Sequence, residues 1–138
     1  MKKRTYIDLI NIELKYVKLA LAGNDEMDLN IAAYHCQQAV EETCGYITQR
    51  LGIRSIREHK IEKWVSYLKE NTVDVPILIE QNSTEISEWE SKSRYNINFY
   101  ASAQLISQIA DEVERWLMDM EAISIKKDIK TKNREIDN

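Results

Sequence analysis

The chain has 138 residues, of which 43% are hydrophobic and 30% charged, and its formal net charge is −4. This balance suits one compact domain with a single core and argues against disorder. Three glycines and one proline are too few for the many turns of a β-sandwich or barrel. The composition therefore predicts an all-α protein, and the mild negative charge does not favour a general polyanion-binding domain.

The first predicted helix covers residues 6–22. Its apolar residues recur at spacings of three and four, the pattern of an amphipathic helix. Thr5 and Asp8 have the spacing of a capping box, in which each side chain bonds the backbone of the other residue. Gly23 is placed to end the helix.

The second predicted helix covers residues 29–51. Asp28 is a plausible N-cap, and Gly52 stands just past the end. Cys36 and Cys44 lie eight residues apart, which on one helix is a rise of about 12 Å and too far for a disulfide. We expect both cysteines to be reduced core residues.

Three more segments complete the chain. A short helix is expected over 60–71, and a further element over 77–92 has a possible break near 82–83. The last helix is expected over 98–123, with a wide apolar stripe. The polar residues of 124–138 are expected to form a frayed tail.

These elements predict an up-and-down helical bundle of four to five helices over residues 1–123. The connections are short, so consecutive helices should be antiparallel. No apolar run approaches the length of a membrane span, and no signal-peptide pattern appears. We therefore expect a cytoplasmic protein.

The second helix places His35, Gln38 and Glu42 within about 60° of one another on a helical wheel. These three residues form a polar seam at the edge of the core stripe, with Tyr46 on its border. Imidazole and amide groups both donate and accept hydrogen bonds. The seam therefore suits an interhelix network, a dimer face, or a ligand or RNA cleft.

A second candidate site is the pair Arg94 and Tyr95, between the expected fourth element and the last helix. An arginine at a helix N-terminus can hold a phosphate or carboxylate, or it can pair with an acidic neighbour such as Glu42 or Glu90. The sequence has no metal-ligand spacing of His or Cys and no glycine-rich phosphate loop. We expect neither a metal nor a cofactor.

Three segments resemble the HEPN domain family. Residues 34–41 (Tyr-His-Cys-Gln-Gln-Ala-Val-Glu) look like its second-helix signature, 58–61 (Glu-His-Lys-Ile) like its Thr-His-Asp-Leu segment, and 93–96 (Ser-Arg-Tyr-Asn) like its Ala-Arg-Tyr-Pro segment. Their order and spacing fit over roughly 5–122. The resemblance implies a homodimeric helical bundle with a nucleotide- or RNA-linked role, often beside a nucleotidyltransferase in a toxin–antitoxin pair.

The resemblance also shows what this chain lacks. Nuclease members carry Arg-x(4–6)-His near the start of the last helix, but here no His follows Arg94, and His59 is the last His of the chain. Arg54 and His59 have a similar spacing, but they lie between the second and third helices. We expect a non-catalytic binding module; the alternatives are a metal-independent ribonuclease that uses Arg94 with His35 or His59, and a purely structural dimerisation bundle.

Overall fold

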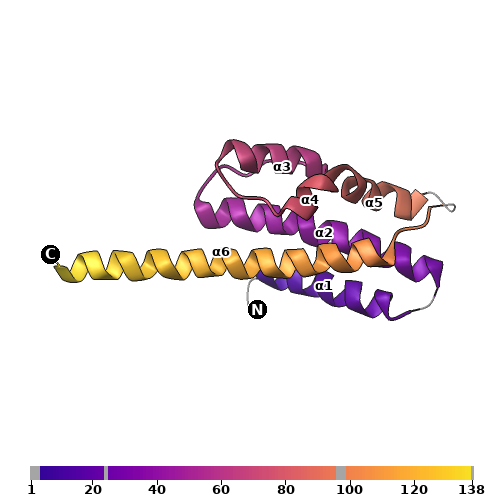
Figure 1. The fold of residues 1–138 in the computed structure, drawn as a ribbon, viewed down its shortest axis with the longest axis horizontal. Helices are drawn as coiled ribbons and strands as arrows, with labels where there is room; N and C mark the ends of the chain where they lie inside the picture. The colour runs from indigo at the N-terminus through magenta and orange to yellow at the C-terminus, as the bar shows by residue number, and fades with distance from the viewer. Residues whose placement is uncertain (1–3, 24, 96–98, 138) are drawn as a thin grey trace.

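The computed structural model describes residues 4–23, 25–95 and 99–137, and describes side chains for 4–23, 25–93 and 99–123. Within these ranges the chain is all helical and contains no strand (Figure 1). The helices are α1 (Tyr6–Leu21), α2 (Glu26–Leu51), α3 (Ile61–Glu70), α4 (Ile77–Gln81), α5 (Ser83–Tyr95) and α6 (Ala103–Asp137). The predicted all-α class is confirmed.

Local capping explains where α1 and α2 begin and end. The predicted capping box is present: Thr5 Oγ1 accepts from the N–H of Asp8 at 3.2 Å, and Asp8 Oδ2 accepts from the N–H of Thr5 at 3.0 Å. The N-cap of α2 is Asp25 and not Asp28, because the Asp25 carboxylate accepts from the N–H of Met27 at 3.1 Å. Gly52 ends α2 in the left-handed conformation with φ 68°.

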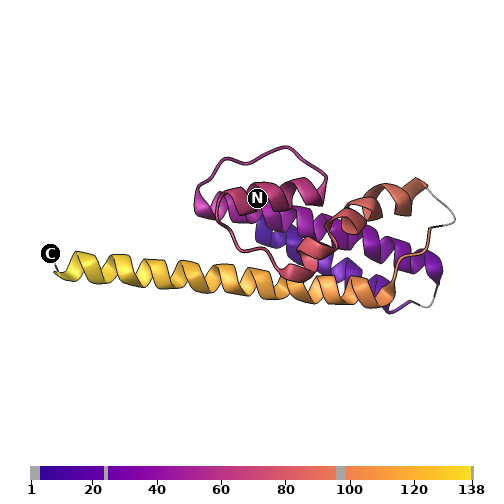
Figure 2. The ribbon, with the colours of Figure 1, turned by 45° about the horizontal axis from the view of Figure 1, so that its top comes forward.

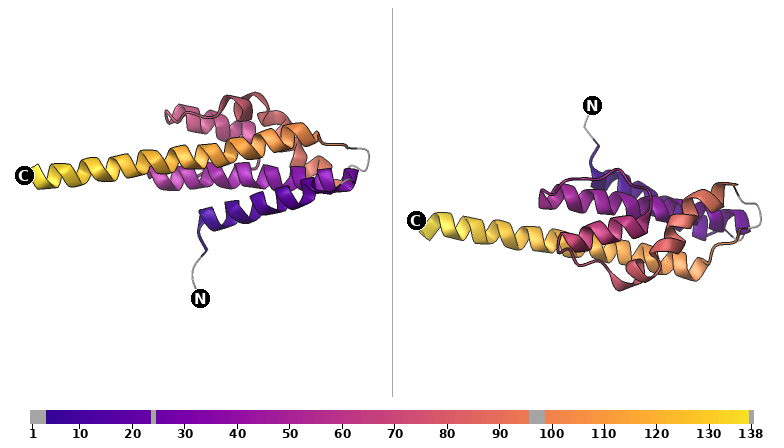
Figure 3. Two further views of the ribbon diagram at one scale, coloured as in Figure 1. Left: turned by 60° about the horizontal axis from the view of Figure 1, so that its bottom comes forward. Right: turned by 90° about the horizontal axis from the view of Figure 1, so that it is seen from above.

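The helix α2 lies at the centre of the bundle and packs against α1, α3, α5 and α6. Its largest interface is with α1, which runs antiparallel to it, as expected for two helices joined by a short connection (Figure 1). The helix α6 lies along α2 and runs in the same direction (Figures 1 and 3). This central position explains why α2 has twelve buried residues, among them every residue from Thr43 to Thr48.

The second half of the chain departs from the expected boundaries. The element expected over 77–92 is split into α4 and α5 at Asn82, whose side-chain amide donates to the Leu78 carbonyl at 2.8 Å. The helix α6 begins later than expected, at Ala103, and continues to Asp137. Its last part projects past the other helices (Figures 2 and 3).

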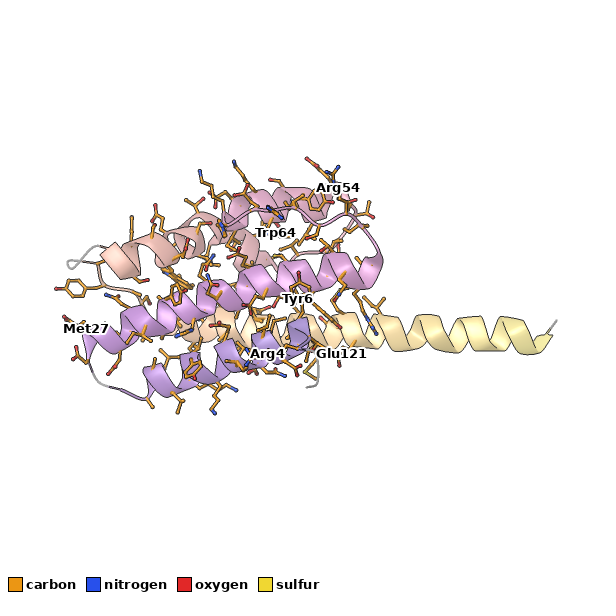
Figure 4. All side chains as sticks on the ribbon, turned by 180° about the vertical axis from the view of Figure 1, so that it is seen from behind. Arg4, Tyr6, Met27, Arg54, Trp64 and Glu121 are labelled. Atoms are coloured by element: carbon orange, nitrogen blue, oxygen red, sulfur yellow. The ribbon has the colours of Figure 1, made fainter. Side chains whose placement is uncertain are left out.

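One hydrophobic core joins all six helices, and three tryptophans, Trp64, Trp89 and Trp116, are buried in it. The contact between α1 and α2 is close, because a Cβ built on Gly45 would lie 3.0 Å from the Tyr6 ring; Figure 4 labels this tyrosine on the face of α1 beside α2. The core and the close helix pair fix α2 rigidly, and α2 carries the predicted polar seam.

Candidate functional site

His35 is held between α1 and α2. Its Nδ1 lies 2.6 Å from Glu13 Oε2 on α1, and both side chains are mostly buried. Its ring stacks on Tyr16 at a centroid distance of 5.1 Å and meets Tyr34 edge-on at 5.2 Å. These contacts fix the orientation of the imidazole, so His35 connects α1 and α2 through its Nδ1 atom.

Gln38 belongs to a second set of contacts on the other flank of the polar seam. Its Nε2 donates to Gln37 Oε1 at 2.6 Å, and Gln37 Nε2 donates to Glu41 Oε2 at 3.1 Å and to the His59 carbonyl at 3.3 Å. His59 Nδ1 then lies 2.9 Å from Glu41 Oε1. This network attaches α2 to the connection that precedes α3.

Glu42 lies between these two sets of contacts. Its Oε2 atom is buried and has no hydrogen-bond partner among the described residues. Burial, with the charges of Glu13 and Glu41 added, raises the pKa of Glu42 to about 7. The carboxyl therefore gains and loses its proton near neutral pH, and its Oε2 atom is unsatisfied within the described residues.

Three residues at this site were not singled out from the sequence. Glu13 lies on another helix, so nothing local connects it with His35. Gln37 and Glu41 are four residues apart, a spacing at which helical side chains interact, and this was the available signal. Tyr46, expected on the border of the polar seam, is only 7% exposed and belongs to the hydrophobic core.

Arg94 and Tyr95 are not at a helix N-terminus as expected. They are the last two residues of α5, and α6 begins only at Ala103, where Ser102 Oγ accepts from the N–H of Leu105 at 3.2 Å. The expectation of an anion site on a helix N-terminus is wrong here, because the C-terminal end of a helix carries the negative end of its dipole. The side chains of both residues lie outside the described residues, as does the expected pairing of Arg94 with an acidic neighbour.

His59 lies in the connection between α2 and α3, with 80% of its side chain exposed. The hydrogen bond that the His59 ring donates to Glu41, together with the charge of Glu41, raises the pKa of His59 above its usual value. Arg54 is in the same connection, where its carbonyl accepts from the Tyr67 hydroxyl. The Arg54–His59 string is thus part of a loop and not of a helix, unlike the nuclease motif.

The described residues contain no group of three or more His, Cys, Asp or Glu side chains that could hold a metal ion. Cys36 and Cys44 are free and buried, and burial raises the pKa of both thiols above the usual range. None of the helices, over the part of the chain that the structure describes, is long and apolar enough to cross a membrane.

Most of the chain matches one protein family. The HEPN domain model matches residues 9–129, most of the chain. The chain belongs to the HEPN family. The match includes α2 with its polar seam, and it ends within the projecting part of α6. Comparisons with curated proteins and with solved structures find no match.

Proposed function

We propose that this chain is a non-catalytic, homodimeric HEPN binding module in a nucleotide- or RNA-linked process, and that its polar seam binds a protein partner of the nucleotidyltransferase type. The observation that carries the proposal is the charge of the site. Glu13, Glu41 and Glu42 bring three carboxyl groups to one stretch of α2 and its neighbour α1. A basic side chain of a protein fits this setting, and a phosphate does not.

The geometry of the polar seam supports recognition of a cationic group. The Glu42 Oε2 atom has no donor among the described residues. An arginine or lysine from a partner would supply one, and the pair would be partly shielded from water. His35 and the Glu41–His59 pair flank this position and are already held in place by contacts within the chain. Little ordering is then needed on binding, which favours affinity.

The nuclease alternative needs a proton carrier near a phosphate-binding arginine. The two histidines are on opposite flanks of the polar seam, and each is bonded to a glutamate. No His follows Arg94 in the sequence. These facts support binding over cleavage.

The first arm of the test is RNA cleavage. Labelled RNA is incubated in EDTA with the full chain, and with Arg94→Ala and His59→Ala variants whose fold is checked by circular dichroism. The proposal expects no cleavage above the buffer control. Cleavage by the wild type that a folded variant loses would establish a nuclease and overturn the proposal.

The second arm is binding, measured by calorimetry against a minimal nucleotidyltransferase, against ATP and against an RNA oligonucleotide. Glu42→Lys is expected to weaken protein binding at least about tenfold, and Gln38→Lys serves as a partly exposed second variant. Glu85→Lys, on the exposed side of α5, is the matched control. Absence of binding to the nucleotidyltransferase overturns the proposal, and binding of none of the three ligands favours a structural bundle.

A further inference from the structure

The last part of α6 projects beyond the other helices of the bundle. The helix has 35 residues and is roughly 52 Å long, and it extends past α1 and α2 (Figure 3). An isolated helix of the length of residues 124–137 is marginal in water. A packing partner for this segment would stabilise it as a helix.

A groove lies beside α6 close to the point where the helix leaves the bundle. Figure 2 shows the connection between α3 and α4 reaching α6 in this region. The groove has a volume of about 860 Å³. Apolar residues of α6 and of the α3–α4 connection line it: Trp116, Met120, Ile123, Val73, Val75 and Ile77. Ile77 and Ile123 are 70% and 48% exposed, which is unusual for isoleucine.

The rim of this groove is acidic. Asp74, Glu112 and Asp119 lie along it, and the one basic residue, Arg115, already pairs with Glu112 at 2.8 Å. Asp119 is exposed and forms no ion pair with any described residue. The segment 124–138 is basic, with five Lys or Arg against three Asp or Glu. Groove and segment therefore carry opposite charge.

Along α6, the acidic and basic residues of one helix face are arranged symmetrically about Ile123. One face of the helix, within about 40° of Ile123, carries residues at spacings of four, three, four, four, three and four. They are Glu112, Trp116, Asp119, Ile123, Lys127, Lys130 and Arg134. The spacings are the same in both directions from Ile123. Asp119 and Lys127 are each four residues from Ile123, and Glu112 and Arg134 are each eleven residues from it, so each acidic residue on one side has a basic residue at the same distance on the other.

We propose that two copies of this chain pair through antiparallel α6 helices, with the 124–137 segment of each copy seated along the groove of the other. In this register, position 127 of one copy lies opposite Asp119 of the second, and position 134 lies opposite Glu112. Ile123 meets its own copy on the two-fold axis, as an isologous interface requires. This proposal rests on the proposed homodimer and names the surface that forms it.

The test measures the oligomeric state of the full chain by sedimentation equilibrium. Asp119→Lys places a lysine opposite Lys127 twice per dimer, so the dissociation constant should rise at least about tenfold. Lys127→Asp alone should do the same. The double variant Asp119→Lys/Lys127→Asp exchanges the charges and should return the constant to within about threefold of the wild type. Met118→Glu, 71% exposed on another face of α6, is the control and should leave it unchanged.

A second measurement locates the axis. Ile123→Cys should form an intermolecular disulfide under mild oxidation, and Met118→Cys should not, because only the former residue meets its own copy. Cys36 and Cys44 are buried and do not compete. Three results would disprove the α6 interface but not the homodimer. They are a dimer that is insensitive to Asp119→Lys, a dimer that the double variant does not restore, and a dimer that Met118→Glu dissociates. A wild-type chain that is monomeric at every concentration would disprove both the α6 interface and the homodimer. Partner binding at the polar seam is tested separately, by the Glu42 and Gln38 variants.

Discussion

Glu42 makes stability depend on pH in a direction opposite to that of most carboxyl groups. Its pKa rises to about 7 in the folded chain from 4.5. Between these values the folded state holds a proton that the unfolded state has lost, so this contribution to stability is complete below pH 4.5 and disappears as the pH rises to 7. Glu42→Gln, which mimics the protonated form, should stabilise the chain at pH 8 by about 1 kcal/mol, a value reduced for the half-exposed position.

Urea unfolding of wild type and Glu42→Gln at pH 4 and pH 8 measures this effect. The two proteins should be equally stable at pH 4 and differ only at pH 8. Thr84→Ala on the exposed side of α5 serves as the control, because it removes no titratable group and should change stability equally at both pH values. A difference between wild type and Glu42→Gln that is the same at both pH values would show that Glu42 ionises normally.

His59 reports on the other flank of the polar seam. The hydrogen bond that His59 donates to Glu41 and the charge of Glu41 raise the pKa of His59. This pair therefore supports folding below pH 6.5, and the support is lost as the pH rises through the raised pKa. Titration followed by NMR should show that Glu41→Gln lowers the His59 pKa toward 6.5. Glu90→Gln should lower it less, because Glu90 acts only through its charge. Equal effects of the two variants would contradict the hydrogen bond as the main cause.

At the scale of an element, the end of α2 depends on the backbone of Gly52. The residue has φ 68°, and no atom lies within 4 Å of a Cβ built there, so any cost of substitution comes from backbone strain. Gly52→Ala should lower the free energy of unfolding by about 1 kcal/mol. Gly52→Asn should cost less, because asparagine tolerates the left-handed conformation. Thermal unfolding of the pair measures the difference, and a larger loss for Asn than for Ala would disprove this explanation.

The success of sequence reasoning differed between elements for a physical reason. The Thr5–Asp8 capping box and the Gly52 cap are interactions within a few residues, and both were predicted. The boundary between α5 and α6 was misjudged, because Arg94 and Tyr95 lack a local helix-stop signal and α5 continues through them. The N-cap of α2 was assigned to Asp28, since both Asp25 and Asp28 satisfy the local rule.

At the scale of the whole molecule, the projecting part of α6 should be a helix in the dimer and fray in the monomer. Isolated helical segments of this length have little stability of their own. Hydrogen exchange should show protection of amides 126–137 that increases with protein concentration. In Asp119→Lys the same amides should exchange quickly at every concentration, and the amides of α2 in the core should stay protected in both proteins. Protection that does not depend on concentration would mean that another contact holds the segment.

The candidate site was predicted only in part. Helical periodicity placed His35, Gln38 and Glu42 on one face of α2, and the structure keeps them there. Periodicity could not identify Glu13 or His59 as neighbours, because they reach this face from α1 and from the connection before α3. It also placed Tyr46 on the border of the polar seam, where packing of the neighbouring helices buries it.

The sequence by itself determined the helical class, the family and most helix ends, because composition, periodicity and caps act over a few residues. Only the tertiary structure decided which charges meet. It buried Glu42 and brought Glu13 from α1 close to it, and both effects raise the pKa of that carboxyl; it also left the last part of α6 outside the bundle. The reason is that the packing of helices sets the distances between residues far apart in the chain, and charge interactions depend on those distances.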